Sequence, residues 1–227
     1  MALSVEGLTS GSGNGLPKTI TPGNNRVKIN NIYLEDFTYI ENAKHFMINV
    51  ETEPIADFQG FMLDKENPDA GHHLGQVGRV KGSQYAFADG TTKSGVQIYR
   101  DKSILIFLQN LCNALDINDW FQEQNNAHET IEDFVDAFNK TAPFKDIYLD
   151  VCIAGKEYVS NGGYTNYDMW FPKAEGGKYA YGSVDSPKIL TYNENVHLKK
   201  LEVKNVEDFG NPNGLNIPAA SSDFSLD

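Results

Sequence analysis

Residues 147–171 read IYLDVCIAGKEYVSNGGYTNYDMWF, and this stretch predicts a β-hairpin. Apolar residues alternate from Ile147 to Ile153, which is the period of a strand with one buried face. The four residues 160–163, SNGG, tolerate positive φ and favour a tight reversal of the chain. Alternation then resumes and gives the returning strand two faces, one with Tyr167, Met169 and Phe171 and the other with Tyr164, Asn166, Asp168 and Trp170.

The second of these faces is aromatic, although the pattern places it toward solvent. Tyr164 and Trp170 lie on it, and Lys156 and Tyr158 enter it from the first strand. Large aromatic rings beside a cation on an open sheet face are typical of surfaces on which flat ligands stack, and nucleic-acid bases are the leading candidates. The alternative interpretation is that another part of the protein covers this face.

A second segment, residues 78–102, also interleaves cations with aromatic residues. Cations bind phosphates, and aromatic rings stack on bases at ~1–3 kcal/mol per base. The alternative is that the aromatic residues belong to the core and the cations only keep the protein soluble. From the two segments together we expect phosphate contacts at Arg79, Lys81, Lys93, Arg100 and Lys156, and stacking at Tyr85, Tyr99, Tyr158, Tyr164 and Trp170.

The net charge of −12 over 227 residues argues against a protein that coats duplex DNA with one broad basic face. The charges are segregated, however. Residues 113–150 hold nine acids and two bases, whereas residues 71–112 hold five bases and two acids. The mildly basic segments are also the aromatic, strand-like ones, and this distribution is compatible with a binding groove in an acidic protein.

Cysteine usage and the first residues predict an intracellular protein. Cys112 and Cys152 each lie inside an apolar run, which indicates buried free thiols in a reducing compartment. The opening residues lack the charged start and apolar core of a signal peptide. No apolar run approaches the ~18 residues of a membrane span. We therefore expect the protein in the cytoplasm of a host cell.

The order of the expected elements predicts a mainly β fold with a helical insert. Strand candidates fill the segment 26–99; they are RVKINNIY, HFMINVE, the residues 58–63, QVGRV, QYAF and GVQIY. Helical spacing follows from Asp101, the expected N-cap, and again from Thr130 to Asn139, before the hairpin. A five-stranded OB barrel has its helix between the third and fourth strands, which matches this order, and its ligand would lie across the middle strands.

The expected organisation is one OB-like α+β domain, residues 26–204, with a helical insert at about 101–141. Residues 1–25 are predicted to form a flexible arm, and residues 205–227 a flexible tail. The acidic-aromatic tip of the tail, Asp223, Phe224 and Asp227, is a candidate site for replication proteins. An ordinary disordered end is an equal alternative.

Catalytic, metal and cofactor motifs give no positive signal. His72 and His73 are adjacent, but no further ligand lies at a familiar spacing, so a solvated loop is the better interpretation. Neither cysteine lies in an electropositive, exposed setting that would activate a thiolate. We expect a protein that is not an enzyme and that uses no metal or cofactor.

Several segments resemble the single-stranded DNA-binding proteins of crAss-like tailed bacteriophages. They are NNRVKINNIYLEDF, GQVGRVKGSQYAF, ILIFLQNLCNAL, TIEDFVDAFNK and the hairpin, and the resemblance covers about residues 25–200. It implies a non-enzymatic OB-fold protein that protects single strands during phage DNA replication and recombination.

The function expected from the residues is therefore single-stranded DNA binding with little sequence preference. One rival is a phage structural or decoration protein, a β-sandwich whose exposed aromatic residues pack against a neighbouring subunit. A further rival is a carbohydrate-binding module, which also uses open aromatic faces.

Overall fold

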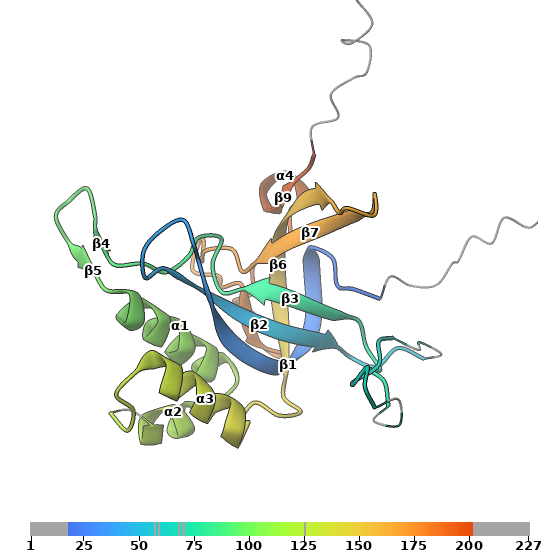
Figure 1. Ribbon diagram of the computed structural model, residues 1–227, viewed down its shortest axis with the longest axis horizontal. Helices are drawn as coiled ribbons and strands as arrows, with labels where there is room; N and C mark the ends of the chain where they lie inside the picture. The colour runs from blue at the N-terminus through green and yellow to red at the C-terminus, as the bar shows by residue number, and fades with distance from the viewer. Residues whose placement is uncertain are drawn as a thin grey trace, which may run out of the picture.

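The computed structural model describes residues 18–201 except 57, 59, 68, 70 and 125, and its centre is a closed five-stranded barrel (Figure 1). The barrel strands are β1 (Gly23–Asp36), β2 (Lys44–Thr52), β3 (Val77–Lys81), β6 (Tyr148–Val159) and β7 (Thr165–Trp170). They pair in the order β1-β2-β3-β7-β6, and β6 pairs again with the start of β1. Every barrel pairing is antiparallel except that of β3 with β7. The predicted OB-fold-like class is confirmed.

β1 can serve both sides of the barrel because it is long and contains a bulge. Its first residues pair with β6, and the rest of the strand pairs with β2. The register shifts between Ile29 and Asn31, so the side-chain alternation is offset by one residue at that point. As a result Ile32 is fully buried, whereas Asn31 and Tyr33 lie on the outer face.

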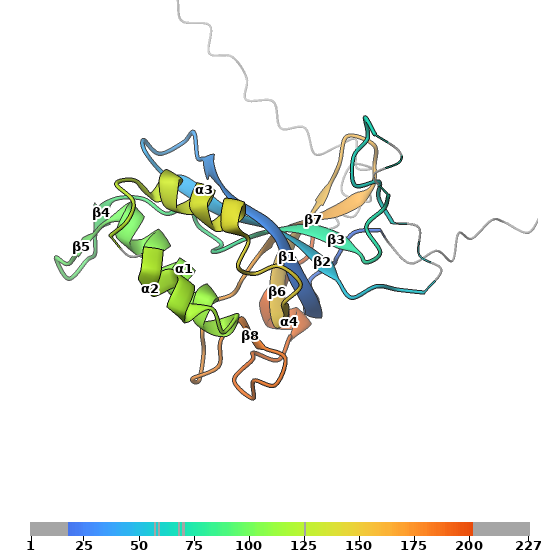
Figure 2. The same cartoon turned by 90° about the horizontal axis from the view of Figure 1, so that it is seen from below.

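Three helices pack together beside the barrel (Figure 2). They are α1 (Arg100–Ala114), α2 (Asn118–Gln124) and α3 (Ile131–Thr141). Thr130 caps α3, because its hydroxyl accepts a hydrogen bond from the Asp133 amide at 3.1 Å. The Asn139 side-chain amide donates to the Ile32 carbonyl at 2.7 Å and accepts from the Ile32 amide at 3.0 Å. These hydrogen bonds lie where β6 no longer pairs with β1. None of the described helices is long and apolar enough to cross a bilayer.

The remaining elements are short. β4 (Gly90–Thr91) and β5 (Gln97–Ile98) form a hairpin that projects away from the barrel, which we call the arm (Figure 1). β8 (Tyr181–Ser183) and β9 (Leu198–Lys199) both pair with β6, and α4 (Glu194–His197) directly precedes β9.

The core fills the barrel and the space between the barrel and the helices. Its largest fully buried side chains include Phe46, Ile48, Leu108, Phe138 and Ile153. They come from β2, α1, α3 and β6, so one apolar cluster joins the strands to the helical insert. The helical insert therefore belongs to the same folding unit as the barrel.

Several local predictions are wrong. Residues 58–63 form no strand among their described positions, and 84–87 contribute only the bridge from Phe87 to Lys44. Tyr99, without a side-chain bond, is the N-cap of α1 in place of Asp101. The flexible N-terminal segment expected at residues 1–25 is too long, because Ile20 is buried and β1 begins at Gly23. Residues 1–17 lie outside the described part of the chain.

Candidate functional site

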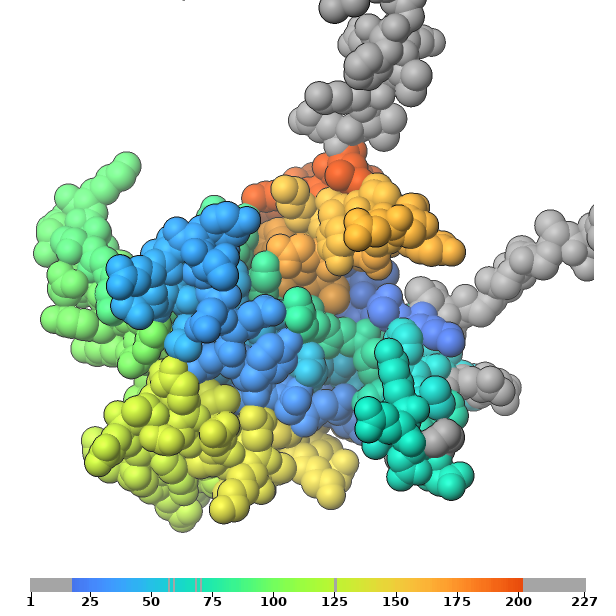
Figure 3. All heavy atoms as spheres, viewed as in Figure 1, coloured from blue at the N-terminus to red at the C-terminus, as the bar shows by residue number. Residues whose placement is uncertain are grey.

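A groove crosses the outer face of β3, on the side of the barrel shown in Figure 3. It consists of two hollows of about 700 and 650 Å³ that share Thr19, Gly78 and Arg79. Tyr158, Asn166 and Asp168 line the end of the groove next to β6 and β7, and Asn31, Asn49 and Lys65 line the other end. We call this feature the β3 groove.

The groove exists because the parallel strands β3 and β7 pair only at their C-terminal ends. They are in register only at Val80 with Met169 and at Lys81 with Trp170. Nearer the start of β3, the chain before β1 fills the space between β3 and β7, since the Ile20 amide donates to the Val77 carbonyl at 3.0 Å. A Cβ at Gly78 would lie 3.1 Å from the Cβ of Ile20, so the glycine permits this close approach. The floor of the groove is therefore built by residues on three separate segments.

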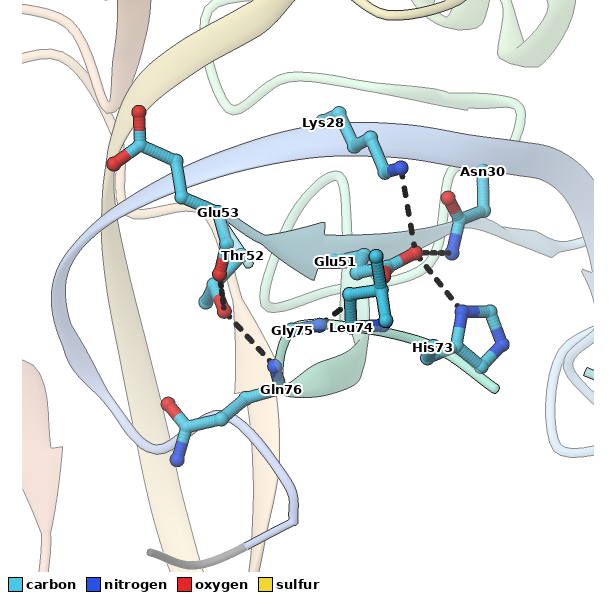
Figure 4. Close-up of polar contacts among 9 residues, drawn as sticks. All are labelled: Lys28, Asn30, Glu51, Thr52, Glu53, His73, Leu74, Gly75 and Gln76. Carbon is cyan, nitrogen blue, oxygen red and sulfur yellow. Dashed lines mark hydrogen bonds and ion pairs between the residues drawn. The ribbon is translucent and has the colours of Figure 1, made fainter. Parts of the chain in front are cut away.

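The connection between β2 and β3 forms one wall of the groove, and Glu51 at the end of β2 holds it in place (Figure 4). One carboxylate oxygen of Glu51 accepts from the amides of Leu74 and Gly75, at 3.0 and 3.3 Å. The other lies 2.9 Å from Nδ1 of His73. This connection carries Phe61 and Lys65 into the groove, and Lys18 lies over the Phe61 ring, 5.6 Å from its centroid.

Glu51 is charged despite being buried. Burial raises the pKa of this carboxyl, but the hydrogen bonds from His73 and Gly75 and the nearby Lys28 outweigh burial and lower the pKa below its ordinary value. Lys28 Nζ lies 3.7 Å from the carboxylate. The Glu51 charge is thus compensated inside the fold, so it adds little negative potential to the groove.

Arg79 is the cation at the centre of the β3 groove. Its Nη1 donates to the Tyr33 hydroxyl at 3.3 Å and lies 3.7 Å from a carboxylate oxygen of Glu35. Burial lowers the pKa of Arg79, but the hydrogen bond to Tyr33 and the nearby acids outweigh burial and raise the pKa above its ordinary value, so the guanidinium stays charged. Its side chain is 57% exposed and can therefore reach a ligand.

Two amide side chains lie beside Arg79 on the outer face. Asn49 Nδ2 donates to Asn31 Oδ1 at 2.6 Å, across the pairing of β2 with β1. Each of these amides keeps hydrogen-bonding capacity toward the groove. The groove thus combines a cation, amides and the ring of Tyr158, which is 46% exposed.

A row of lysines continues from the groove across the outer face. Lys81 of β3 is in register with Trp170, Lys156 of β6 with Asp168, and Lys199 of β9 with Lys156. Lys199 lies over the Trp170 ring, 5.8 Å from its centroid. Trp170 itself is only 7% exposed, so the expectation that its face is open is wrong. Lys199 of β9, which pairs with β6, covers part of the ring.

Tyr85 and Tyr164 are exposed, as expected for stacking residues, but they lie in different places. Tyr85, 67% exposed, lines a hollow of about 240 Å³ together with Trp170. Tyr164, 75% exposed, lies at the turn between β6 and β7. This turn is the predicted tight reversal of the chain, and the Gly163 amide closes it by donating to the Ser160 carbonyl at 2.8 Å.

Three expected site residues are separate from the groove. Lys93 lies in the turn of the arm, and Tyr99 and Arg100 lie where the arm meets α1 (Figure 1). The Arg100 guanidinium is occupied, because it donates to the Asn42 carbonyl at 3.0 Å and pairs with Asp101. The ten expected residues are thus dispersed: two line the groove, two belong to the lysine row and three lie at the arm, while Tyr85 and Trp170 line a separate small hollow and Tyr164 lies at the β6–β7 turn. The tail residues Asp223, Phe224 and Asp227 lie outside the described residues.

Sequence reasoning missed Asn31, Tyr33, Asn49, Phe61 and Lys65. Asn49 could have been found, because the apolar positions Phe46, Ile48 and Val50 place it on the outer face of its strand. Asn31 and Tyr33 could not, since the bulge in β1 reverses the faces that simple alternation predicts.

Among the described residues, no group of three His, Cys, Asp or Glu side chains could hold a metal ion. His73 is bonded to Glu51, and His197 accepts from the Asn193 amide at 3.0 Å. Burial raises the pKa of the Cys152 thiol to about 11 and that of Cys112 to about 12, so both are protonated at neutral pH. The thiols are therefore inert core side chains.

Comparison of the chain with protein-family models, curated proteins and solved structures gives no match.

Proposed function

We propose that this protein binds single-stranded DNA in the β3 groove, with little sequence preference. The observation that carries the proposal is the position of Arg79, at the centre of a groove that crosses the outer face of β3 in a five-stranded OB-like barrel. The same face of OB barrels binds oligonucleotides and oligosaccharides between the loops that join strands 1 to 2 and strands 4 to 5. Here those loops follow β1 and β6.

The chemistry of the groove favours a nucleic-acid strand. Arg79 and Lys65 can neutralise phosphates, Tyr158 offers a ring to a base, and the amides of Asn49 and Asn31 can bond base edges without selecting one base. A site of ~4–16 nucleotides is expected for one barrel. Protection of single strands during phage replication and recombination is the role we propose, supported by the resemblance to crAss-like phage proteins.

Anisotropy of a labelled oligo-dT tests the proposal directly. A label on the DNA is needed because Trp170 is too covered to report stacking. Tyr158→Ala should weaken binding by ~1–3 kcal/mol. Tyr179→Ala is the matched control, because Tyr179 is similarly exposed, at 51%, and lies outside the groove.

Other ligands separate the rivals. Tighter binding of an RNA of equal length would replace DNA as the ligand, and capture of a neutral oligosaccharide without oligonucleotide binding would favour a carbohydrate-binding module. Absence of oligonucleotide binding at every salt concentration would favour the structural protein. The sandwich expected for that rival is not the fold, since the strands close into one barrel.

A further inference from the structure

Asp168 lies where the β3 groove meets the lysine row. It lines the groove, and both of its carboxylate oxygens lie 2.8 Å from Nζ of Lys81. Lys156 is its partner in register on β6. The carboxylate therefore lies between cations on the two strands that flank β7.

The exposures of the pair are unequal. The Asp168 side chain is 47% exposed, whereas that of Lys81 is 17% exposed. Lys81 is largely covered, and its ammonium group is held by the carboxylate. An exposed carboxylate in an ion pair of this kind is held weakly, because solvent and salt screen the attraction. A second anion can therefore take its place.

A phosphodiester matches the group that it would replace. It carries one negative charge and presents two oxygens to a single ammonium, as the carboxylate does. A strand that passes Arg79 along the groove reaches Asp168 next, because both residues line the same hollow.

We propose that Asp168 occupies a phosphate position of the nucleic-acid site, and that the ligand must displace it from Lys81 to bind there. Asp168 thereby lowers the affinity of the site and speeds release of the strand. This inference rests on the proposed function, and it assigns a role to an acid within a site expected to be basic.

The test is the affinity of Asp168→Asn for a labelled oligo-dT of about 16 nucleotides, the upper end of OB-fold site sizes. An amide cannot hold the ammonium as an ion pair, so the variant should bind about two- to fivefold tighter at low salt. Its log–log salt dependence should steepen by up to about 0.7, the value of one phosphate on a single strand.

Two controls separate this role from a change in net charge. Asp150→Asn makes the same charge change, but Asp150 pairs with Arg26 at 2.8 Å on the β1–β6 side and lines none of the described hollows, so it should leave affinity unchanged. In a Lys81→Gln background, Asp168→Asn should give no gain. Urea unfolding of each variant verifies that it is folded.

The outcomes distinguish the inference from the proposed function. Equal affinity of wild type and Asp168→Asn would overturn the inference while leaving the proposed function standing. A gain that persists without Lys81 would also overturn it, since Asp168 would then only repel the strand. Failure of wild type and variant alike to bind at low salt would overturn the proposed function and the inference with it.

Discussion

Glu51 accepts from His73 across 2.9 Å and so joins the end of β2 to the connection that walls the groove. The two residues are 22 positions apart in the chain. The same carboxylate also accepts from the amides of Leu74 and Gly75, so one buried side chain organises the last part of this connection. The shape of the groove therefore depends on a residue that does not face the ligand.

Replacement of Glu51 by Gln should destabilise the protein by about 1–3 kcal/mol. The amide nitrogen would face the donors that the carboxylate satisfies, and at least one buried donor would lose its partner. Urea unfolding measures the change. Glu53→Gln is the control, because Glu53 is 57% exposed and lies 4.0 Å from its partner Arg26. A loss for Glu53→Gln equal to that for Glu51→Gln would contradict the assigned role.

The stabilising contribution of the Glu51 carboxylate should also be lost in acid. Its pKa in the folded protein lies below the ordinary value of 4.5, so its stabilising contribution is complete above pH 4.5 and is lost as the pH falls through the folded pKa. Urea unfolding between pH 3 and 7 should show a larger acid loss for wild type than for Glu51→Gln. Parallel pH curves for the two proteins would rule out this contribution.

Trp170→Ala should cost about 3–5 kcal/mol of stability, because the side chain is only 7% exposed. Tyr85→Ala, in the same small hollow but 67% exposed, should change stability by no more than about 0.5 kcal/mol. Thermal or urea unfolding measures both. If Trp170→Ala were as stable as wild type, the ring would be open to solvent and available for stacking.

The placement of residues 18–22 in the barrel can be tested at Gly155. A methyl group added there would collide with the ring of Pro22, which cannot easily move, so Gly155→Ala should destabilise by about 1–3 kcal/mol. Gly90→Ala is the matched control, because no atom lies within 4 Å of its added Cβ. A neutral Gly155→Ala would show that the segment before β1 does not pack on β6.

The fold could be predicted from the sequence because its strands carry a clear period of two and its helices a clear period of 3.6. The hairpin at 147–171 and the change of period at 101 place the helical insert directly before the hairpin, and in the structure it lies between the third and fourth barrel strands. The start of the folded domain was less predictable. Residues 18–22 carry no alternation, yet they pack against β3 through Ile20.

The candidate site was predictable only in part. Alternation placed Arg79 and Tyr158 on an outer face, and both line the groove. It could not show that Trp170 is covered, because burial on an outer face depends on β9 and on Lys199 above the ring. Nor could it show that Glu51 ties down a distant loop, since the contact spans two elements that no local pattern connects.

Phosphate binding by Arg79 is tested by the salt dependence of oligo-dT binding by wild type and Arg79→Gln. For single strands the slope is about −0.7 per phosphate neutralised, so Arg79→Gln should bind more weakly and show a slope smaller by about 0.7. Arg26→Gln, a strand arginine paired with Asp150 outside the groove, should keep the wild-type slope. Equal affinity and equal slope for wild type and Arg79→Gln would show that Arg79 does not bind phosphate.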